Sequence, residues 1–194
     1  MSAAPLDMSR REAVRRIALL LGGAMVASEA ILRGQSAPGK ASAEAFTQAD
    51  RELLDEIGEA IIPATDIPGA KAAGIGAFMA MMVADCYSER EHAVFREGLA
   101  KVEQACVSRF GRPFLAATPE ERGALAAELD SQRGAYEAKK GKDEPAHYFR
   151  MMKELTVLGY FSSEIGCTRA VRYVEVPGRF DADIPYRKGD PAWF

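Results

Sequence analysis

Apolar side chains recur at helical spacing through most of the chain. The first such segment follows Thr47-Gln-Ala-Asp50, in which an N-cap hydroxyl precedes an acid by three residues. The apolar positions after it fall on one face of a helix: Leu53, Leu54, Ile57, Ile61 and Ile62. Pro63 ends the pattern, because proline cannot continue a helix without losing a backbone hydrogen bond.

The same period predicts further helices downstream. They are expected at 75–87, 88–111, 118 to about 130, 146–159 and 163–173. Ser88-Glu-Arg-Glu91 and Thr118-Pro-Glu-Glu121 are capping boxes, and Gly111 is placed to end the second of these helices. Ser131–Pro145 is expected to be a polar connector with no inward face. No run alternates long enough for a strand, so we predict an all-α protein: a single compact helical domain of about five to seven helices.

The C-terminal segment has a different composition. Pro177, Pro185 and Pro191 prevent it from being helical. It also contains four aromatic residues, more than a solvated disordered tail normally has: Phe180, Tyr186, Trp193 and Phe194. We therefore expect an extended aromatic and proline-rich strap that lies on its own helices or on another protein.

The N-terminal segment resembles a bacterial export signal. Four arginines, including the pair Arg10 and Arg11, precede the short apolar run Ile17–Ala27, which is too short for a membrane-spanning helix of about 20 residues. The arginine pair favours the twin-arginine pathway, which carries folded proteins. An amphipathic N-terminal helix that stays in place is the alternative, and cleavage after Ala41-Ser42-Ala43 is left open. The expected organisation is a leader and linker at 1–43, a helical domain at 44–174 and an arm at 175–194.

The charge differs between these parts. Residues 1–43 carry a net charge of +3 and the whole chain carries −3, so residues 44–194 carry −6. A mildly acidic domain without a basic stripe is a poor candidate for nucleic-acid binding, which depends on phosphate neutralisation. No second apolar run is long enough for a membrane anchor, so membrane association is expected only through partners.

Two Glu-x-x-His motifs contain both histidines of the chain. They are Glu89 with His92 and Glu144 with His147. Two such motifs, with one acid from each of two more helices, are the ligand set of a di-iron bundle. Glu56 or Glu59 and Glu164 are the acids that would complete it. The favoured interpretation is simpler: both motifs lie in first helical turns, where acids are stabilised by the helix dipole.

The three cysteines, Cys86, Cys106 and Cys167, show no metal-binding or haem-attachment spacing. An odd number leaves at least one thiol without an internal partner in an oxidising compartment. Cys167 is the candidate for a disulfide to another chain. Phosphate-binding glycine loops and a nucleophile elbow are also missing from the sequence.

Three segments resemble the gluconate 2-dehydrogenase subunit 3 family. They are IIPATDIPGAKAAG, LTVLGYFSSEIGCTRAVRYVEVPGRFDADIPY and KGDPAW, and the resemblance extends from about Leu53 to Trp193. It implies a small non-catalytic subunit without a cofactor of its own. Its implied partner is a large FAD-bearing subunit of the glucose-methanol-choline type, in some complexes with a multi-haem cytochrome c subunit. The large subunit typically lacks an export signal, so the small one would escort it, already folded with FAD, to the periplasm.

The resemblance also implies a partner interface. Its residues come from the matching segments: Gly159, Tyr160, Phe161, Ser163, Glu164, Cys167, Pro177, Gly178, Tyr186 and Trp193. Aromatic residues dominate interface hot spots, so Tyr160, Phe161 and Trp193 are the expected anchors. Pro177 and Gly178 are expected to form the bend that releases the strap. Each residue has a core or turn role as its alternative, and Pro63–Ala70 is either a second contact or only a rigid loop between helices. A free-standing periplasmic helical protein is the remaining alternative for the whole chain.

Overall fold

Helix α3, Gln48–Ile61, begins where the sequence predicts. In the computed structural model, which describes residues 46–176, 178–180 and 183–193, the Thr47 side chain accepts a hydrogen bond from the backbone N–H of Asp50. The Asp50 carboxylate accepts one from the backbone N–H of Thr47 at 2.8 Å, which completes the predicted capping box. The leader at 1–43, with Arg10 and Arg11, lies outside the described residues.

The described residues are helical, which confirms the all-α prediction. The other α-helices are α4 Ile75–Cys86, α5 Glu89–Phe110, α6 Pro119–Glu137 and α7 Tyr148–Ser162. The 3₁₀ turns η2 Lys71–Ala73 and η3 Phe114–Ala116 lie between helices, and the π-helical turn η4 Gly166–Ala170 follows α7. In these residues the only strand-like feature is an isolated bridge between Arg172 and Trp193.

The predicted helix ends at α5 and α6 are also confirmed. Ser88 and Glu91 form a capping box at the start of α5, and Gly111 ends it in the left-handed conformation. Thr118 and Glu121 cap α6, with Pro119 in the first turn.

Two expectations about irregular segments are wrong. Residues 131–137 continue α6 instead of starting a connector, because Gln, Arg, Ala and Glu favour helix even without an apolar stripe. The Tyr136 hydroxyl, which donates a 3.0 Å hydrogen bond to the Pro145 carbonyl, gives this region the inward contact that the sequence pattern did not indicate. The helix expected at 163–173 is only a short turn that becomes π-helical at Gly166–Ala170.

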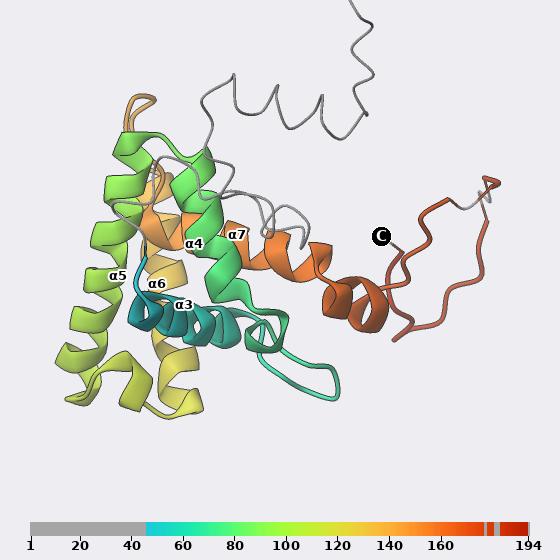
Figure 1. The fold of residues 1–194 in the computed structure, drawn as a ribbon, viewed down its shortest axis with the longest axis horizontal. Helices are drawn as coiled ribbons and strands as arrows, with labels where there is room; N and C mark the ends of the chain where they lie inside the picture. The colour runs from blue at the N-terminus through green and yellow to red at the C-terminus, as the bar shows by residue number, and fades with distance from the viewer. Residues whose placement is uncertain (1–45, 177, 181–182, 194) are drawn as a thin grey trace, which may run out of the picture. The chain divides into compact units, whose positions relative to one another are not determined.

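Helix α7 lies at the centre of the packing. It contacts α3, α4, α5 and α6, and it runs behind α4 and continues into η4 and the arm (Figure 1). The largest fully buried side chains come from all of these elements: Phe95, Phe114, Phe149, Leu54, Ile57, Ile75, Met79, Leu125, Leu129 and Met152. Each contributes roughly 1.5–3 kcal/mol by leaving water. This core fixes the end of α7, from which the arm departs.

None of the helices in the described part of the chain has the length and apolar character that crossing a membrane requires.

Candidate functional site

Two of the sequence segments that carry the family resemblance meet at the C-terminal end of α7. The Tyr160 hydroxyl donates a 2.7 Å hydrogen bond to the carbonyl of Pro68, in the loop between α3 and η2. Gly159 lies against α4, where a Cβ atom would stand 2.5 Å from the Phe78 ring and 3.1 Å from Ile75. Both residues are buried. They therefore hold the end of α7 in place and do not themselves form part of the exposed surface.

Glu59 also holds the loop that Tyr160 contacts. The Glu59 carboxylate accepts hydrogen bonds from the backbone N–H of Ala64 at 2.8 Å and of Lys71 at 2.9 Å. Residues 63–66 are nevertheless exposed. The loop is therefore well tethered and open to solvent, which agrees with a rigid inter-helix loop; whether it is also a second contact stays a prediction.

Ser163 shapes the exit from α7. Its hydroxyl donates to the Tyr160 carbonyl at 2.7 Å and accepts from the backbone N–H of Gly166 at 3.1 Å. A Cβ atom at Gly166 would lie only 1.9 Å from the Tyr160 carbonyl oxygen, so the turn requires glycine. The Cys167 thiol donates to the Phe161 carbonyl at 3.0 Å. Ser163 and Cys167 thus have internal roles in this turn.

The disulfide predicted for Cys167 stays a prediction. All three cysteines are unpaired: Cys86 is exposed, Cys106 is buried and Cys167 is half-buried. Cys106 is fully buried, and this burial raises the pKa of its thiol, so the side chain packs as a small hydrophobic residue.

Phe161 borders an apolar groove on the outer face of α7. The groove encloses about 680 Å³ and is lined by Arg133, Arg150, Lys153, Glu154, Val157, Leu158, Phe161 and Ser162. Val157 and Leu158 are exposed, at 41% and 53%. Neither was predicted as a surface residue, although their spacing of four and three residues from Phe161 places all three on one side of α7.

The arm exposes its aromatic residues. Phe180 is 90% exposed, Tyr186 75% and Trp193 54%. Glu164 and Gly178 are exposed as well, and Gly178 has a positive φ of 70°. Pro177 lies outside the described residues. The described aromatic side chains of the arm are therefore not buried against the helices of this chain, and a partner that covers the strap stays a prediction.

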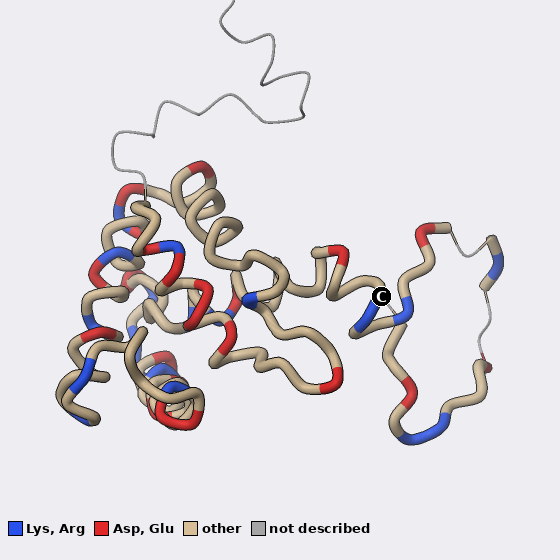
Figure 2. Tube along the Cα trace, turned by 60° about the horizontal axis from the view of Figure 1, so that its bottom comes forward, with Lys and Arg blue, Asp and Glu red and all other residues tan. Residues whose placement is uncertain are grey.

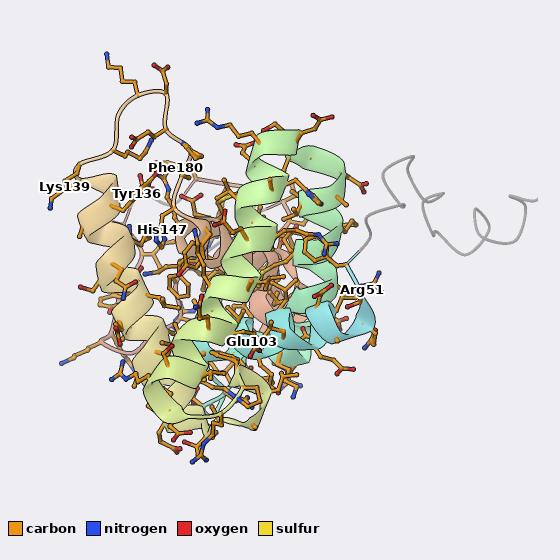
Figure 3. All side chains as sticks on the ribbon, turned by 90° about the vertical axis from the view of Figure 1, so that its left-hand side faces the viewer. Arg51, Glu103, Tyr136, Lys139, His147 and Phe180 are labelled. Atoms are coloured by element: carbon orange, nitrogen blue, oxygen red, sulfur yellow. The ribbon has the colours of Figure 1, made fainter. Side chains whose placement is uncertain are left out.

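The di-iron arrangement finds no support in the described residues, where no three His, Cys, Asp or Glu side chains gather as a metal site. The His147 imidazole lies beside Tyr136, with ring centroids 5.4 Å apart (Figure 3), and its Nδ1 accepts a hydrogen bond from the Phe149 N–H. The Glu144 carboxylate accepts from the Gly141 N–H. Glu56, one of the acids that would complete the set, pairs instead with Lys71 and Arg122.

Charge does not single out another site. Acidic and basic residues are interspersed along the helices (Figure 2), and several of them form ion pairs between neighbouring elements, such as Arg109 of α5 with Glu128 of α6. The surface features that remain are the tethered loop at 63–68, the α7 groove and the aromatic arm.

Residues 48–178 match the protein family described as gluconate 2-dehydrogenase subunit 3. No match is found among curated proteins or among solved structures. The matched region runs from the start of α3 to Gly178, so it includes the tethered loop and the exit from α7 but not the pieces DADIPY and KGDPAW of the arm. Because it spans well over half of the sequence, the chain belongs to the gluconate 2-dehydrogenase subunit 3 family.

Proposed function

We propose that this chain is a non-catalytic small subunit that binds, stabilises and escorts a large FAD-dependent dehydrogenase subunit of the glucose-methanol-choline type. The dehydrogenase oxidises a sugar or polyol, and a multi-haem cytochrome c subunit is a further partner where the complex has one. In this proposal FAD belongs to the large subunit and haem to the cytochrome, while this chain provides surface and an export signal.

The observation that carries the proposal is the exposure of the arm. Val176, Phe180 and Tyr186 are each at least three-quarters exposed on a segment without regular structure. Clusters of large, solvent-exposed apolar side chains are typical of interaction sites. Burying one of them in a partner is worth roughly 1.5–3 kcal/mol, and aromatic residues are frequent hot spots. The exposure of these side chains therefore supports the proposal that a second protein binds to the arm and covers them.

The leader supports the escort part of the proposal. Arg10 and Arg11 precede a short apolar run, as in twin-arginine signals. A flavoprotein that receives FAD in the cytoplasm has to cross the membrane folded, and a bound small subunit would supply the address for both chains. The proposed location is the periplasmic face of the inner membrane, with membrane contact only through partners.

Co-expression with a large FAD-dependent dehydrogenase subunit of the glucose-methanol-choline type from the same organism tests the proposal. We expect both chains to co-purify from the periplasm, and the double substitution Arg10→Lys with Arg11→Lys to retain both in the cytoplasm. The double variant Phe180→Ser with Tyr186→Ser should export the small chain alone, because the leader is intact and the partner contact is lost. A flavoprotein that reaches the periplasm without this chain would overturn the escort role, and failure to co-purify would favour a free-standing protein.

A further inference from the structure

The C-terminal end of the arm returns to Arg172, three residues before the arm begins. Its backbone N–H donates a 2.8 Å hydrogen bond to the carbonyl of Ala192, and Arg172 pairs with Trp193 in an isolated parallel bridge. The chain therefore leaves η4, travels through the arm and returns to its starting point (Figure 1).

The Arg172 side chain strengthens this closure. Its guanidinium lies 3.3 Å from the Asp190 carboxylate, and its central carbon lies 5.4 Å from the centre of the Trp193 ring. The first contact is an ion pair and the second a cation–π interaction, for which arginine over tryptophan is favourable. We call Arg172, Asp190 and Trp193 the arm clasp.

A tight turn places Asp190 in the clasp. The Asp190 N–H donates to the Arg187 carbonyl at 2.9 Å, and the Asp190 carboxylate accepts from the Arg187 N–H at 3.0 Å. Gly189 has a φ of 97°, a conformation that side-chain-bearing residues rarely adopt. The sequence RKGDPAW thus forms a turn followed by the two residues that meet Arg172.

The clasp turns the arm into a loop that carries exposed apolar side chains: Val176, Phe180, Ile184 and Tyr186. A loop whose ends are joined has fewer conformations to lose when it binds than a free tail of the same length. Its charges also balance, because residues 172–193 contain four basic and four acidic side chains. A neutral loop with exposed aromatics suits an apolar, uncharged surface on its partner.

We propose that the arm clasp preorganises the C-terminal loop to dock on an apolar surface of the large dehydrogenase subunit, with Arg172 as the positioning residue. This inference rests on the proposed function. It assigns a role to Arg172 and to the segment KGDPAW. Of these residues, only Trp193 belongs to the interface predicted from the sequence.

Trp193 provides a direct test of the clasp, since it is the only tryptophan in the chain. In the isolated full-length protein, Arg172→Ala should shift the Trp193 emission to longer wavelength and increase its quenching by acrylamide at least twofold. Arg172→Lys keeps the charge and should give an intermediate result. Lys188→Ala is the matched control, because it also removes one positive charge from the exposed loop without touching the clasp. If Arg172→Ala leaves both emission and quenching unchanged, the clasp does not exist in solution.

Binding to the purified large subunit tests the docking role. We expect Arg172→Ala to weaken the complex about tenfold and Lys188→Ala to leave the dissociation constant unchanged, with Arg172→Lys in between. Equal affinity for wild type and Arg172→Ala, with the emission shifted, would overturn the inference and leave the proposed function standing. If the wild-type chain binds no large subunit, the proposed function and the docking role both fail, while the fluorescence still decides whether the clasp forms.

Discussion

The hydroxyl of Tyr160 donates a 2.7 Å hydrogen bond to the carbonyl of Pro68, which lies 92 residues earlier in the chain. Burial raises the pKa of Tyr160, so the phenol stays protonated and able to donate at neutral pH. Through this bond the end of α7, from which the arm departs, is joined to the exposed loop between α3 and η2. The two segments are expected to act as one surface.

Replacing Tyr160 by phenylalanine should loosen that surface. Tyr160→Phe removes one hydrogen bond and should lower the free energy of unfolding by about 1 kcal/mol, measured by urea denaturation. Because the loop loses its connection to α7, amide exchange of residues 64–70 should accelerate and affinity for the large subunit should fall.

Tyr136→Phe is the matched control for this change. The Tyr136 hydroxyl also donates to a proline carbonyl, that of Pro145, at 3.0 Å. We expect a similar loss of stability with unchanged partner affinity. If both variants bind the partner as wild type does, the Tyr160 bond supports the fold alone.

The turn after α7 should not tolerate a side chain at Gly166. A Cβ atom there would meet the Tyr160 carbonyl oxygen, which belongs to the backbone of α7 and cannot move aside cheaply. Gly166→Ala should therefore destabilise the protein by about 2–3 kcal/mol in thermal or urea unfolding.

Gly123, within α6, is the matched control for the glycine substitution. A Cβ atom at this position would meet nothing within 4 Å. Gly123→Ala should stabilise the protein by up to about 1 kcal/mol, because alanine favours helix. Stabilisation by Gly166→Ala would show that the turn adopts another geometry in solution.

The helix starts could be predicted because they depend on neighbouring residues. Features that depend on contacts outside the helix could not be predicted in this way. Thr47, Ser88 and Thr118 mark helix starts because capping involves residues only three positions apart. The end of α6 could not be placed from periodicity, because residues 131–137 carry no apolar stripe and Tyr136 makes its inward contact with Pro145, beyond the end of the helix.

The candidate site was predictable in composition but not in exposure. The aromatic arm could be recognised from prolines and aromatics alone, and its exposure at Phe180 and Tyr186 agrees with a binding role. Tyr160 and Gly159 looked like interface residues, yet the contacts of Pro68 and Phe78 bury them. A sequence segment shared by a family does not separate residues that touch a partner from residues that hold those residues in place.

Glu56 should contribute more to stability than most charged residues of this chain. Its carboxylate pairs with Lys71 at 2.5 Å and with Arg122, and the Glu56 and Arg122 side chains are only 16% and 14% exposed. Glu56→Gln should cost about 2 kcal/mol in urea unfolding, because it leaves a largely buried guanidinium without its counter-charge.

Glu128 allows the matched comparison, since its ion pair with Arg109 is about half-exposed on both sides. Glu128→Gln should cost less than about 0.5 kcal/mol. Equal costs for the two variants would mean that solvent reaches Glu56 as freely as Glu128.

His147 should make the stability depend on pH in a defined window. Its Nδ1 accepts the N-cap hydrogen bond from Phe149, which a protonated imidazole cannot do. Burial lowers the pKa of His147, with Glu137 opposing and the cations Lys101 and Arg133 adding to the effect. The folded-state pKa lies below the unfolded value of about 6.5. As the pH falls, the unfolded chain therefore binds more protons than the folded protein does. The contribution of neutral His147 is therefore complete above about pH 7.5 and is lost as the pH falls through 6.5.

His147→Asn separates this effect from other titrations. Asparagine is a good N-cap and does not titrate, so the variant should keep its stability between pH 7.5 and 5.5 while the wild type becomes less stable. Hydrogen bonds from the His147 backbone N–H and from Arg150 lower the pKa of Glu137, so its stabilising effect is lost only at more acidic pH and in both proteins. Urea unfolding of the two proteins at several pH values measures the difference directly. Parallel curves across this window would show that protonation of His147 costs no stability, so that losing the hydrogen bond from Phe149 is compensated elsewhere.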